Sequence, residues 1–350
     1  MKAKCKIGIW GQFGDGGKIA DGQAVRTTVI TEELKKRYGT DSVCVVNTNN
    51  WRKRPLTFLW NTLKLNLACE KIVIFPADNG FKVCVPILNI SNAFFRRELY
   101  YVVIGGFLPA LLRRKKQYLQ MLKKYRALFV QTQNIKRDLE EIGLNDVHIL
   151  SNLKRLNTVL PDQVQVCQTE KIRVCTLSRI TEDKGITYAV EAVKMANQVL
   201  GEGRICLDIY GICPPDYQGA FDALLKENRE FVRYGGVVDF DKTTETLSSY
   251  FAMLLPTYYY GEGFPGCVVD AYNAALPIIA TDWNYNADVI VEGENGFLVP
   301  IKDAKSISEA LVKLYRNRQL AFDIAMRNLA CAEEYKPDKV LEEFYEFMDK

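Results

Sequence analysis

Histidine is almost absent from this chain of 350 residues, which has only His148. A histidine metal site or a Ser-His-Asp triad would have to use this residue, yet it lies in an apolar, strand-like pattern at 147–150. The pair Asp239 and Asp241 precedes a run rich in Thr and Ser at 243–250, where N-capping of a helix explains it better than metal binding. We therefore expect a packed histidine, no metal and no cofactor.

The ten cysteines include no Cys-x-x-Cys pair, which is the spacing typical of redox and zinc sites. Half of them lie in apolar, β-like runs: Cys5, Cys44, Cys84, Cys175 and Cys206. We predict that these five are reduced and packed as small hydrophobic residues, rather than joined in disulfides or bound to a metal.

Long hydrophobic runs are also missing. The longest uncharged, largely apolar run, 99–112, contains two glycines and a proline, and it is shorter than the roughly 20 residues that span a bilayer. The first six residues lead directly into a strand-like pattern, without the hydrophobic core of a signal peptide. We therefore expect the protein in the cytoplasm.

The net charge of +4 conceals an asymmetry. Residues 1–155 hold 27 Lys and Arg against 12 Asp and Glu, a balance of +15, whereas the remainder has a balance of −11. The segment 109–126 interleaves seven basic residues with apolar ones and predicts a basic amphipathic helix. It is either a solvated outer helix or a helix that lies on an anionic membrane, and the charge balance favours the membrane.

We expect no nucleic acid as a partner, because no motif for it is present and the second half of the chain is acidic.

Strand-like and helix-like runs alternate along the chain, which predicts an α/β fold with parallel sheets covered by helices on both faces. The first unit opens with a strand at 4–10, a glycine loop at 11–17 and a helix to about residue 37. This is a Rossmann-like start, but its glycines fit neither the dinucleotide fingerprint nor a P-loop. The aperiodic segment 156–171 predicts a linker, so we expect domains at 1–158 and 159–335.

The stretch 258–270, with the sequence YYYGEGFPGCVVD, joins an apolar run to a helix-like run. Its three glycines and one proline leave backbone N–H groups free at a helix N-terminus, which is a ready site for phosphate. Glu262 and Asp270 flank this turn, and a carboxylate there would accept hydrogen bonds from the hydroxyls of a ribose or a sugar. The structural alternative is a glycine-rich turn that only caps a packed helix.

A second strand–loop–helix unit begins at residue 171. Its loop carries Arg179 and Lys184, and two cations at such a position form a natural clamp for a diphosphate. The alternative is a solvated surface pair.

These two motifs resemble those of retaining glycosyltransferases of the GT-B fold, family 4 (glycosyl transferases group 1). Glu262-Gly-Phe-Pro-Gly266 is followed by an acid eight residues after Glu262, although Asp270 stands where that family has a second Glu. Arg179 is followed five residues later by Lys184-Gly185, as in that family. The resemblance covers nearly the whole chain and is strongest over residues 171–300.

The resemblance implies two Rossmann-like domains whose parallel sheets face each other across a cleft, with the last helix, 336–350, crossing back to the first domain. It implies metal-independent transfer of a hexose from a nucleotide-diphosphate-sugar donor with retention, in which Glu262, Arg179 and Lys184 act as catalytic residues. Substrate-binding residues would be Gly14, Asp15, Gly16, Gly17, Gly263, Phe264, Pro265, Gly266, Cys267 and Asp270.

The first loop, the segment 21–26 and the segment 105–109 are similar to those of bacterial sugar transferases for capsule, O-antigen or exopolysaccharide. Together with the basic helix, this implies a glycan or polyprenyl-diphosphate-linked acceptor and a peripheral position at the inner face of the plasma membrane. A non-catalytic, membrane-bound GT-B shell for glycans or partners is one alternative, but the presence of Arg179, Lys184 and Glu262 together argues against it. A GT-B nucleotide-sugar epimerase is the other, and a basic membrane-facing domain has no purpose there.

Overall fold

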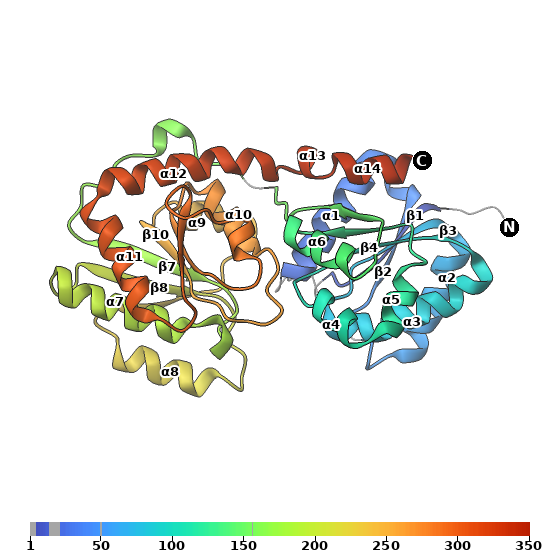
Figure 1. Ribbon diagram of the computed structural model, residues 1–350, viewed down its shortest axis with the longest axis horizontal. Helices are drawn as coiled ribbons and strands as arrows, with labels where there is room; N and C mark the ends of the chain where they lie inside the picture. The colour runs from blue at the N-terminus through green and yellow to red at the C-terminus, as the bar shows by residue number, and fades with distance from the viewer. Residues whose placement is uncertain (1–4, 14–21, 50, 156) are drawn as a thin grey trace. The chain divides into compact units, whose positions relative to one another are not determined.

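The computed structural model describes residues 5–13, 22–49, 51–155 and 157–350 (Figure 1). The chain divides into two compact units, which we call the N-terminal unit (residues 1–154 with 337–350) and the C-terminal unit (155–336). The division falls between Lys154 and Arg155, four residues before the boundary that we expected from the sequence. Each unit has its own parallel sheet and its own hydrophobic core.

The N-terminal unit contains a six-stranded sheet in the order β2-β1-β3-β4-β5-β6, in which all neighbouring strands are parallel. The strands are β1 Cys5–Gly11, β2 Val43–Asn47, β3 Cys69–Ile74, β4 Glu98–Val102, β5 Ala127–Val130 and β6 Val147–Ile149. The helices are α1 Gly22–Tyr38, α2 Pro55–Ala68, α3 Asp78–Phe95, α4 Leu108–Arg114, α5 Lys116–Leu122, α6 Gln133–Glu141, α13 Pro337–Val340 and α14 Glu342–Asp349.

Successive residues of these strands face opposite sides of the sheet, and each side is covered by helices. In β4, the ring of Tyr100 packs edge-on against Phe347 beside α1 and α14, while that of Tyr101 packs against Phe81 of α3. On the α3 side, Trp10 of β1 stacks on Phe58 of α2 with ring centroids 5.2 Å apart. The apolar runs of the sequence are therefore strands that are buried on both faces, as expected of a parallel sheet.

The C-terminal unit repeats this plan with a sheet in the order β12-β11-β10-β7-β8-β9, again with parallel neighbours. Its strands are β7 Ile172–Leu177, β8 Ile205–Tyr210, β9 Val232–Gly236, β10 Ala252–Leu255, β11 Ile278–Thr281 and β12 Gly296–Val299. Its helices are α7 Ile186–Leu200, α8 Gln218–Glu227, α9 Thr243–Leu247, α10 Gly266–Asn273, α11 Ala304–Arg316 and α12 Arg318–Ala332. In β10, Leu254 packs in the core with α7 and α11, and Leu255 in the core with α10.

The C-terminal segment packs on the N-terminal unit through specific polar contacts. The ammonium group of Lys71 donates hydrogen bonds to the carbonyls of Phe347 and Met348, at 2.9 and 3.1 Å. Nδ1 of His148 lies 2.6 Å from a carboxylate oxygen of Glu343. The single histidine is thus a partnered, half-buried residue of β6, as its sequence environment suggests.

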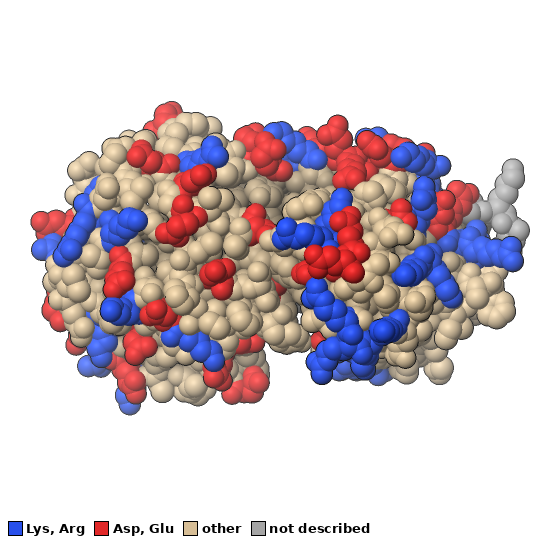
Figure 2. Space-filling model, viewed as in Figure 1, with Lys and Arg blue, Asp and Glu red and all other residues tan. Residues whose placement is uncertain are grey.

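The segment 109–126 differs from the single amphipathic helix that we expected. It forms two short helices, α4 and α5, because the backbone of Lys115 leaves the helical region at φ −132° and ψ 81°. The basic residues are exposed and their apolar neighbours, such as Leu112 and Leu122, are buried in the unit. Figure 2 shows Lys and Arg side chains gathered over the part of the N-terminal unit where Figure 1 has α4 and α5.

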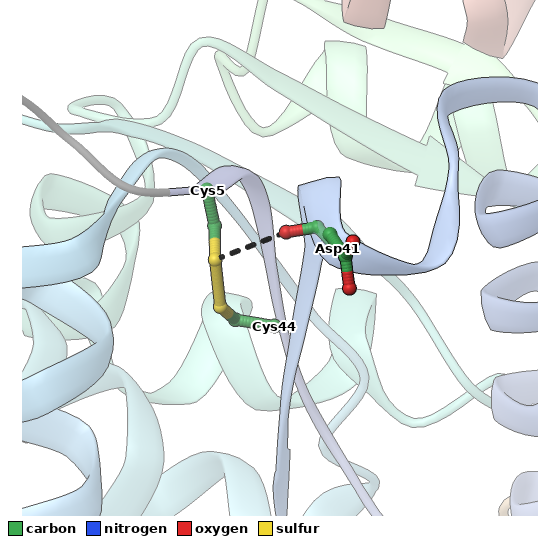
Figure 3. The surroundings of a disulfide bond; sticks show 3 residues. All are labelled: Cys5, Asp41 and Cys44. Atoms are coloured by element: carbon green, nitrogen blue, oxygen red, sulfur yellow. Dashed lines mark hydrogen bonds between the residues drawn. A yellow bond between two sulfur atoms is a disulfide. The ribbon is translucent and has the colours of Figure 1, made fainter.

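Two further expectations are wrong. Cys5 and Cys44, expected to be reduced, form a disulfide between the neighbouring strands β1 and β2, with Sγ of Cys5 3.6 Å from the carbonyl oxygen of Asp41 (Figure 3). Asp241 does not cap α9, because the helix begins after Lys242 and no side chain accepts a hydrogen bond at its N-cap. The disulfide arises from strand pairing, which no local sequence pattern reveals.

Candidate active site

The candidate site lies at the carboxyl ends of β7 and β10. In the sheet, β7 lies between β8 and β10. From β7 the strand order runs outward through β8 and β9 on one side, and from β10 through β11 and β12 on the other, so the order reverses between β7 and β10. Ligands of open α/β sheets bind at such a switch point, outside the carboxyl ends of the strands. The loops that leave β7 and β10 carry both motifs that the sequence singled out, 178–185 and 256–266.

The two loops are joined through their backbones. The N–H of Tyr258 donates to the carbonyl of Asp183 at 2.8 Å, just before the turn at Gly185. Gly185 adopts φ +69°, and a Cβ atom at this position would lie 2.1 Å from the carbonyl oxygen of Pro256. Glycine is therefore required after Lys184, because it permits both the left-handed backbone and the close approach of the second loop.

Lys184 and Glu262 form an ion pair between the two loops. The ammonium nitrogen of Lys184 lies 2.5 Å from one carboxylate oxygen of Glu262, and the two side chains are only 11% and 9% exposed. The hydroxyl of Thr257 donates a second hydrogen bond to the same oxygen at 2.8 Å. Removing two charges from water is costly, and such buried pairs seldom add net stability. A pair in this position is therefore better explained by function than by folding.

Tyr259 brings Arg179 into the same group. The guanidinium carbon of Arg179 lies 5.7 Å from the centroid of the Tyr259 ring, and the ammonium of Lys184 lies 4.9 Å from it. Arg179 is exposed, whereas the side chain of Lys184 is almost buried. The three predicted catalytic residues are thus brought together in the C-terminal unit.

The loop after β11 forms hydrogen bonds with the backbone of the loop that carries Glu262. The indole N–H of Trp283 donates to the carbonyl of Tyr259 at 2.8 Å, and the amide of Asn284 donates to the carbonyl of Tyr260 at 3.0 Å. Asn284 has φ +50°, a left-handed conformation that asparagine tolerates better than most residues. The sequence analysis missed these contacts of Trp283 and Asn284. The only sequence feature that could have indicated them is an asparagine in the turn after an apolar strand.

The predicted phosphate-binding turn forms the N-terminus of α10. Pro265 occupies the N-cap in an extended conformation, and no side chain caps the helix. The ring of Phe264 is buried in the core against Tyr335, so this residue can offer a ligand only its backbone. Gly263, Gly266 and Cys267 complete the turn, and the helix end provides the N–H groups that an anion needs.

Asp270 lies deeper than its predicted role requires. Its side chain is on the inner face of α10, the residue is 1% exposed, and one carboxylate oxygen accepts a hydrogen bond from Thr243 at 2.8 Å. Thr243 begins α9, so this bond ties the two helices together. The contact adds a structural role for Asp270 to the ribose contact that the motif predicts.

The remaining predicted residues belong to the first glycine loop. Gly14, Asp15, Gly16 and Gly17 lie outside the described residues. The chain that leaves β1 is described as far as Phe13, whose N–H donates to the side-chain oxygen of Asn47 at 3.4 Å. Farther along the unit, Gly105 has φ +78° and donates from its N–H to Gln131 at 3.2 Å.

Within the described ranges, one cluster of potential metal ligands occurs, and it lies in the N-terminal unit. It consists of Cys5, Cys44 and Cys69, whose sulfur atoms lie within 4.8 Å of one another. Burial raises the pKa of the Cys69 thiol to about 11, which keeps it protonated at neutral pH. Two of the three sulfurs are joined in the disulfide, so the cluster does not provide three thiolate ligands.

The chain is similar to known proteins in sequence and in fold. Residues 171–317 match the family model of glycosyl transferases group 1, which covers β7 through α11 and hence both loops of the site. Among curated proteins, an uncharacterized 41.2 kDa protein in the cps region of Klebsiella pneumoniae is 25% identical over 186 residues, 52% of this chain and 46% of that protein.

Two other relatives match shorter stretches. The amylovoran biosynthesis glycosyltransferase AmsK of Erwinia amylovora is 22% identical over 41% of this chain and 36% of its own length. A phosphatidyl-myo-inositol mannosyltransferase of Mycobacterium leprae is 34% identical over 25% of this chain and 23% of its own length. This chain therefore spans less than half the length of each of these curated relatives.

Solved structures match over the full chain. Anabaena Alr3699/HepE, crystallised with UDP and glucose, superposes with a TM-score of 0.76 at 13% identity and covers 99% of both chains. The sucrose-phosphate synthase of Thermosynechococcus elongatus superposes with a TM-score of 0.75 at 13% identity, over 99% of this chain and 98% of its own. With its two six-stranded parallel sheets, the chain has the GT-B fold.

Proposed function

We propose that this chain of GT-B fold, whose residues 171–317 form a glycosyl transferases group 1 domain, is a retaining glycosyltransferase. It moves a sugar from a nucleotide-diphosphate-sugar to a glycan or polyprenyl-linked acceptor in bacterial surface polysaccharide synthesis. The observation that carries this proposal is the buried pair of Lys184 and Glu262, with Arg179 5.7 Å from the centroid of the Tyr259 ring that Lys184 also approaches.

The charges of this group suit a nucleotide-diphosphate-sugar. Arg179, Lys184 and Glu262 together carry a net charge of +1, and Glu262 lies on the loop that leads into the N-terminus of α10, whose dipole also favours an anion. UDP is the nucleotide that we favour, because the similar Alr3699/HepE structures contain UDP or UDP-glucose. The carboxylate of Glu262 would repel a diphosphate if it were alone. Paired with Lys184, it can instead accept hydrogen bonds from the hydroxyls of the transferred sugar.

In the proposed reaction, the bond between the anomeric carbon and the diphosphate oxygen breaks, and the acceptor oxygen bonds to the same carbon on the same face. The acceptor proton passes to the leaving phosphate, which departs as the nucleoside diphosphate. Arg179, Lys184 and the backbone N–H groups of Phe264, Gly266 and Cys267 stabilise the charge that grows on the leaving group, without a metal. Loss of one such donor costs on the order of 10²–10³ in rate in comparable enzymes.

The acceptor side belongs to the N-terminal unit in this proposal, with the first glycine loop contributing to it. Relatives in a capsule region and in amylovoran biosynthesis support a surface polysaccharide as the product. The excess of positive charge over residues 1–155 supports an acceptor held at an anionic membrane surface.

Thermal stability in the presence of UDP-, GDP- and TDP-sugars tests the donor site. A ligand at about 100 times its dissociation constant adds about 2.7 kcal/mol to the free energy of unfolding, and we expect this for one nucleotide series. The stabilisation should disappear in Lys184→Ala, each variant being compared with its own ligand-free melting curve. Lys194→Ala, which removes an exposed lysine from α7, is the matched control and should keep it.

Product analysis then separates transfer from its alternatives. With a radiolabelled donor and a lipid extract, we expect label in the lipid-linked fraction and an α or β linkage that matches the donor anomer. Conversion of the donor to its epimer without an acceptor would replace the transferase with the epimerase. A well-folded protein that no nucleotide or nucleotide-sugar stabilises would refute the proposal.

A further inference from the structure

Helix α2 has polar residues on its buried face and apolar residues on its exposed face. Thr62 and Asn66 are buried beside Phe58 and Leu65, and each side chain donates a hydrogen bond to a backbone carbonyl one turn earlier, at 2.9 Å. The exposed large side chains of the helix are all apolar except one lysine: Leu56, Leu59, Trp60, Leu63 and Leu67.

These exposed residues form one row along the helix. Their spacing of three and four residues puts them on the same face, where Leu56 is 80% and Trp60 57% exposed. Single exposed apolar residues are common on soluble proteins, but a contiguous row of them marks an interaction surface. α2 lies at the periphery of the N-terminal unit (Figure 1).

Helix α3 extends this surface. It contacts α2, and the guanidinium of Arg97, just beyond its end, donates to the carbonyl of Asn66 at 2.8 Å. The C-terminal ends of the two helices therefore lie together. There α3 exposes Ile90 and Phe94, at 68% and 81%. We call these two residues and the row on α2 the apolar face.

Basic residues flank the apolar face at the ends of the two helices. Three consecutive exposed basic residues, 52–54, precede α2. The exposed Arg96 and the half-buried Arg97 follow α3, and the exposed Glu70 and Glu98 are the acidic residues beyond the two helix ends. α2 itself contains Lys64, whose ammonium lies 5.3 Å from the ring centroid of Trp60, and no acidic residue. The acidic residue of α3, Asp78, is paired with a lysine of the same helix at 2.8 Å.

Apolar side chains with a tryptophan among them and a fringe of Lys and Arg fit the interface of an anionic bilayer. Among the described residues, no helix is long and apolar enough to cross a membrane, so contact would be in the plane of the interface. The helices α4 and α5 are less suited to bind a bilayer, because their large apolar residues are buried in the unit and only their basic residues could contact lipid headgroups.

We propose that the apolar face of α2 and α3 binds an anionic lipid bilayer, with Trp60 and Leu56 inserted among the headgroups and the basic residues on the phosphates. The proposal gives a location to the membrane-linked acceptor of the proposed function and rests on that function for its biological purpose. Binding to lipid is measured without donor or transfer, so the two proposals can fail separately.

The test uses the full chain and sedimenting vesicles at 0.15 M salt. We expect binding to vesicles of phosphatidylethanolamine with 30% phosphatidylglycerol, and weak binding to phosphatidylcholine. Leu56→Ser with Trp60→Ser should lower the partition coefficient at least tenfold, since burial of one such side chain is worth about that factor or more. Lys53→Gln should lower it about fivefold, which corresponds to one basic residue at an anionic surface.

Tryptophan fluorescence reports insertion directly. The chain has four tryptophans, and lipids brominated near the headgroup should quench the wild type but not Trp60→Leu. Val199→Ser is the matched control, because Val199 is 57% exposed on α7 of the C-terminal unit and should leave binding unchanged. Substitutions of these exposed residues should leave the melting temperature nearly unchanged, so a loss of lipid binding can be distinguished from unfolding.

Three outcomes would overturn the proposal. The wild type could fail to bind anionic vesicles, or binding could be lost in Arg113→Gln with Lys116→Gln on α4 and α5 while the apolar-face variants still bind. Sedimentation velocity could also show a dimer that Leu56→Ser with Trp60→Ser dissociates, in which case a second copy of the chain covers the face.

Discussion

Replacing Lys184 by methionine leaves the carboxylate of Glu262 buried without its counter-ion. Removing one partner of a buried pair typically costs 3–5 kcal/mol, because the remaining charge is neither solvated nor paired. The hydrogen bond from Thr257 to Glu262 persists, at 2.8 Å, so we expect the lower end, about 3 kcal/mol. For a domain of this size, about 2–4 °C per kcal/mol gives a melting temperature lower by roughly 6–12 °C.

A double-mutant cycle isolates the pair. Glu262→Leu alone leaves the ammonium of Lys184 nearly buried, 11% exposed, and should also destabilise the protein. The double variant, Lys184→Met with Glu262→Leu, removes both charges and should be more stable than either single variant. Thermal and urea unfolding, followed by circular dichroism without ligand, measure these differences. Losses that simply add in the double variant, or a loss below about 1 kcal/mol in Lys184→Met, would show that the pair is solvated and refute the reasoning.

Three further predictions concern the framework around the site. Gly185→Ala should cost at least about 2 kcal/mol in urea unfolding, because of φ +69° and the contact with Pro256, whereas Gly219→Ala in the open surface of α8 should stabilise by about 0.5–1 kcal/mol. An equal effect of the two would contradict the close approach of the loops. Asp303 accepts hydrogen bonds from Ser306 at the start of α11, which lower the pKa of its carboxyl below the ordinary 3.8. The carboxylate therefore contributes about 1 kcal/mol to the free energy of unfolding above about pH 3.8, and this contribution disappears as the pH falls through the lowered pKa. Asp303→Ala should lose it at neutral pH, and its stability should depend less on pH in the acid range. An unchanged dependence of stability on pH would argue against the cap. Alkylation under denaturing, non-reducing conditions should modify eight of the ten cysteines, the exceptions being the disulfide pair, and mass spectrometry that finds ten modified would contradict the disulfide.

The helices that the sequence analysis overlooked show the limit of local patterns. The stretch 78–95 contains Gly80, Pro86 and several β-branched residues, which disfavour a helix, yet it forms α3. Its Phe81 packs against three aromatic rings of the unit, and this tertiary packing outweighs the local propensity. The surface character of α2 was missed for a similar reason, since its leucines occur on both faces and periodicity alone does not tell which face is covered.

The sequence by itself predicted the α/β fold with parallel sheets, because strands and helices alternate in short, contiguous segments. Its resemblance to a known family implied the GT-B arrangement, and its loop motifs singled out Arg179, Lys184 and Glu262 as candidate site residues. Only the tertiary structure decided which of those segments contact one another. It joined Lys184 to Glu262 with Tyr259 beside them, paired Cys5 with Cys44, and left the leucines of α2 exposed. These features depend on contacts between residues tens of positions apart, and such contacts are set by the order in which the strands pair.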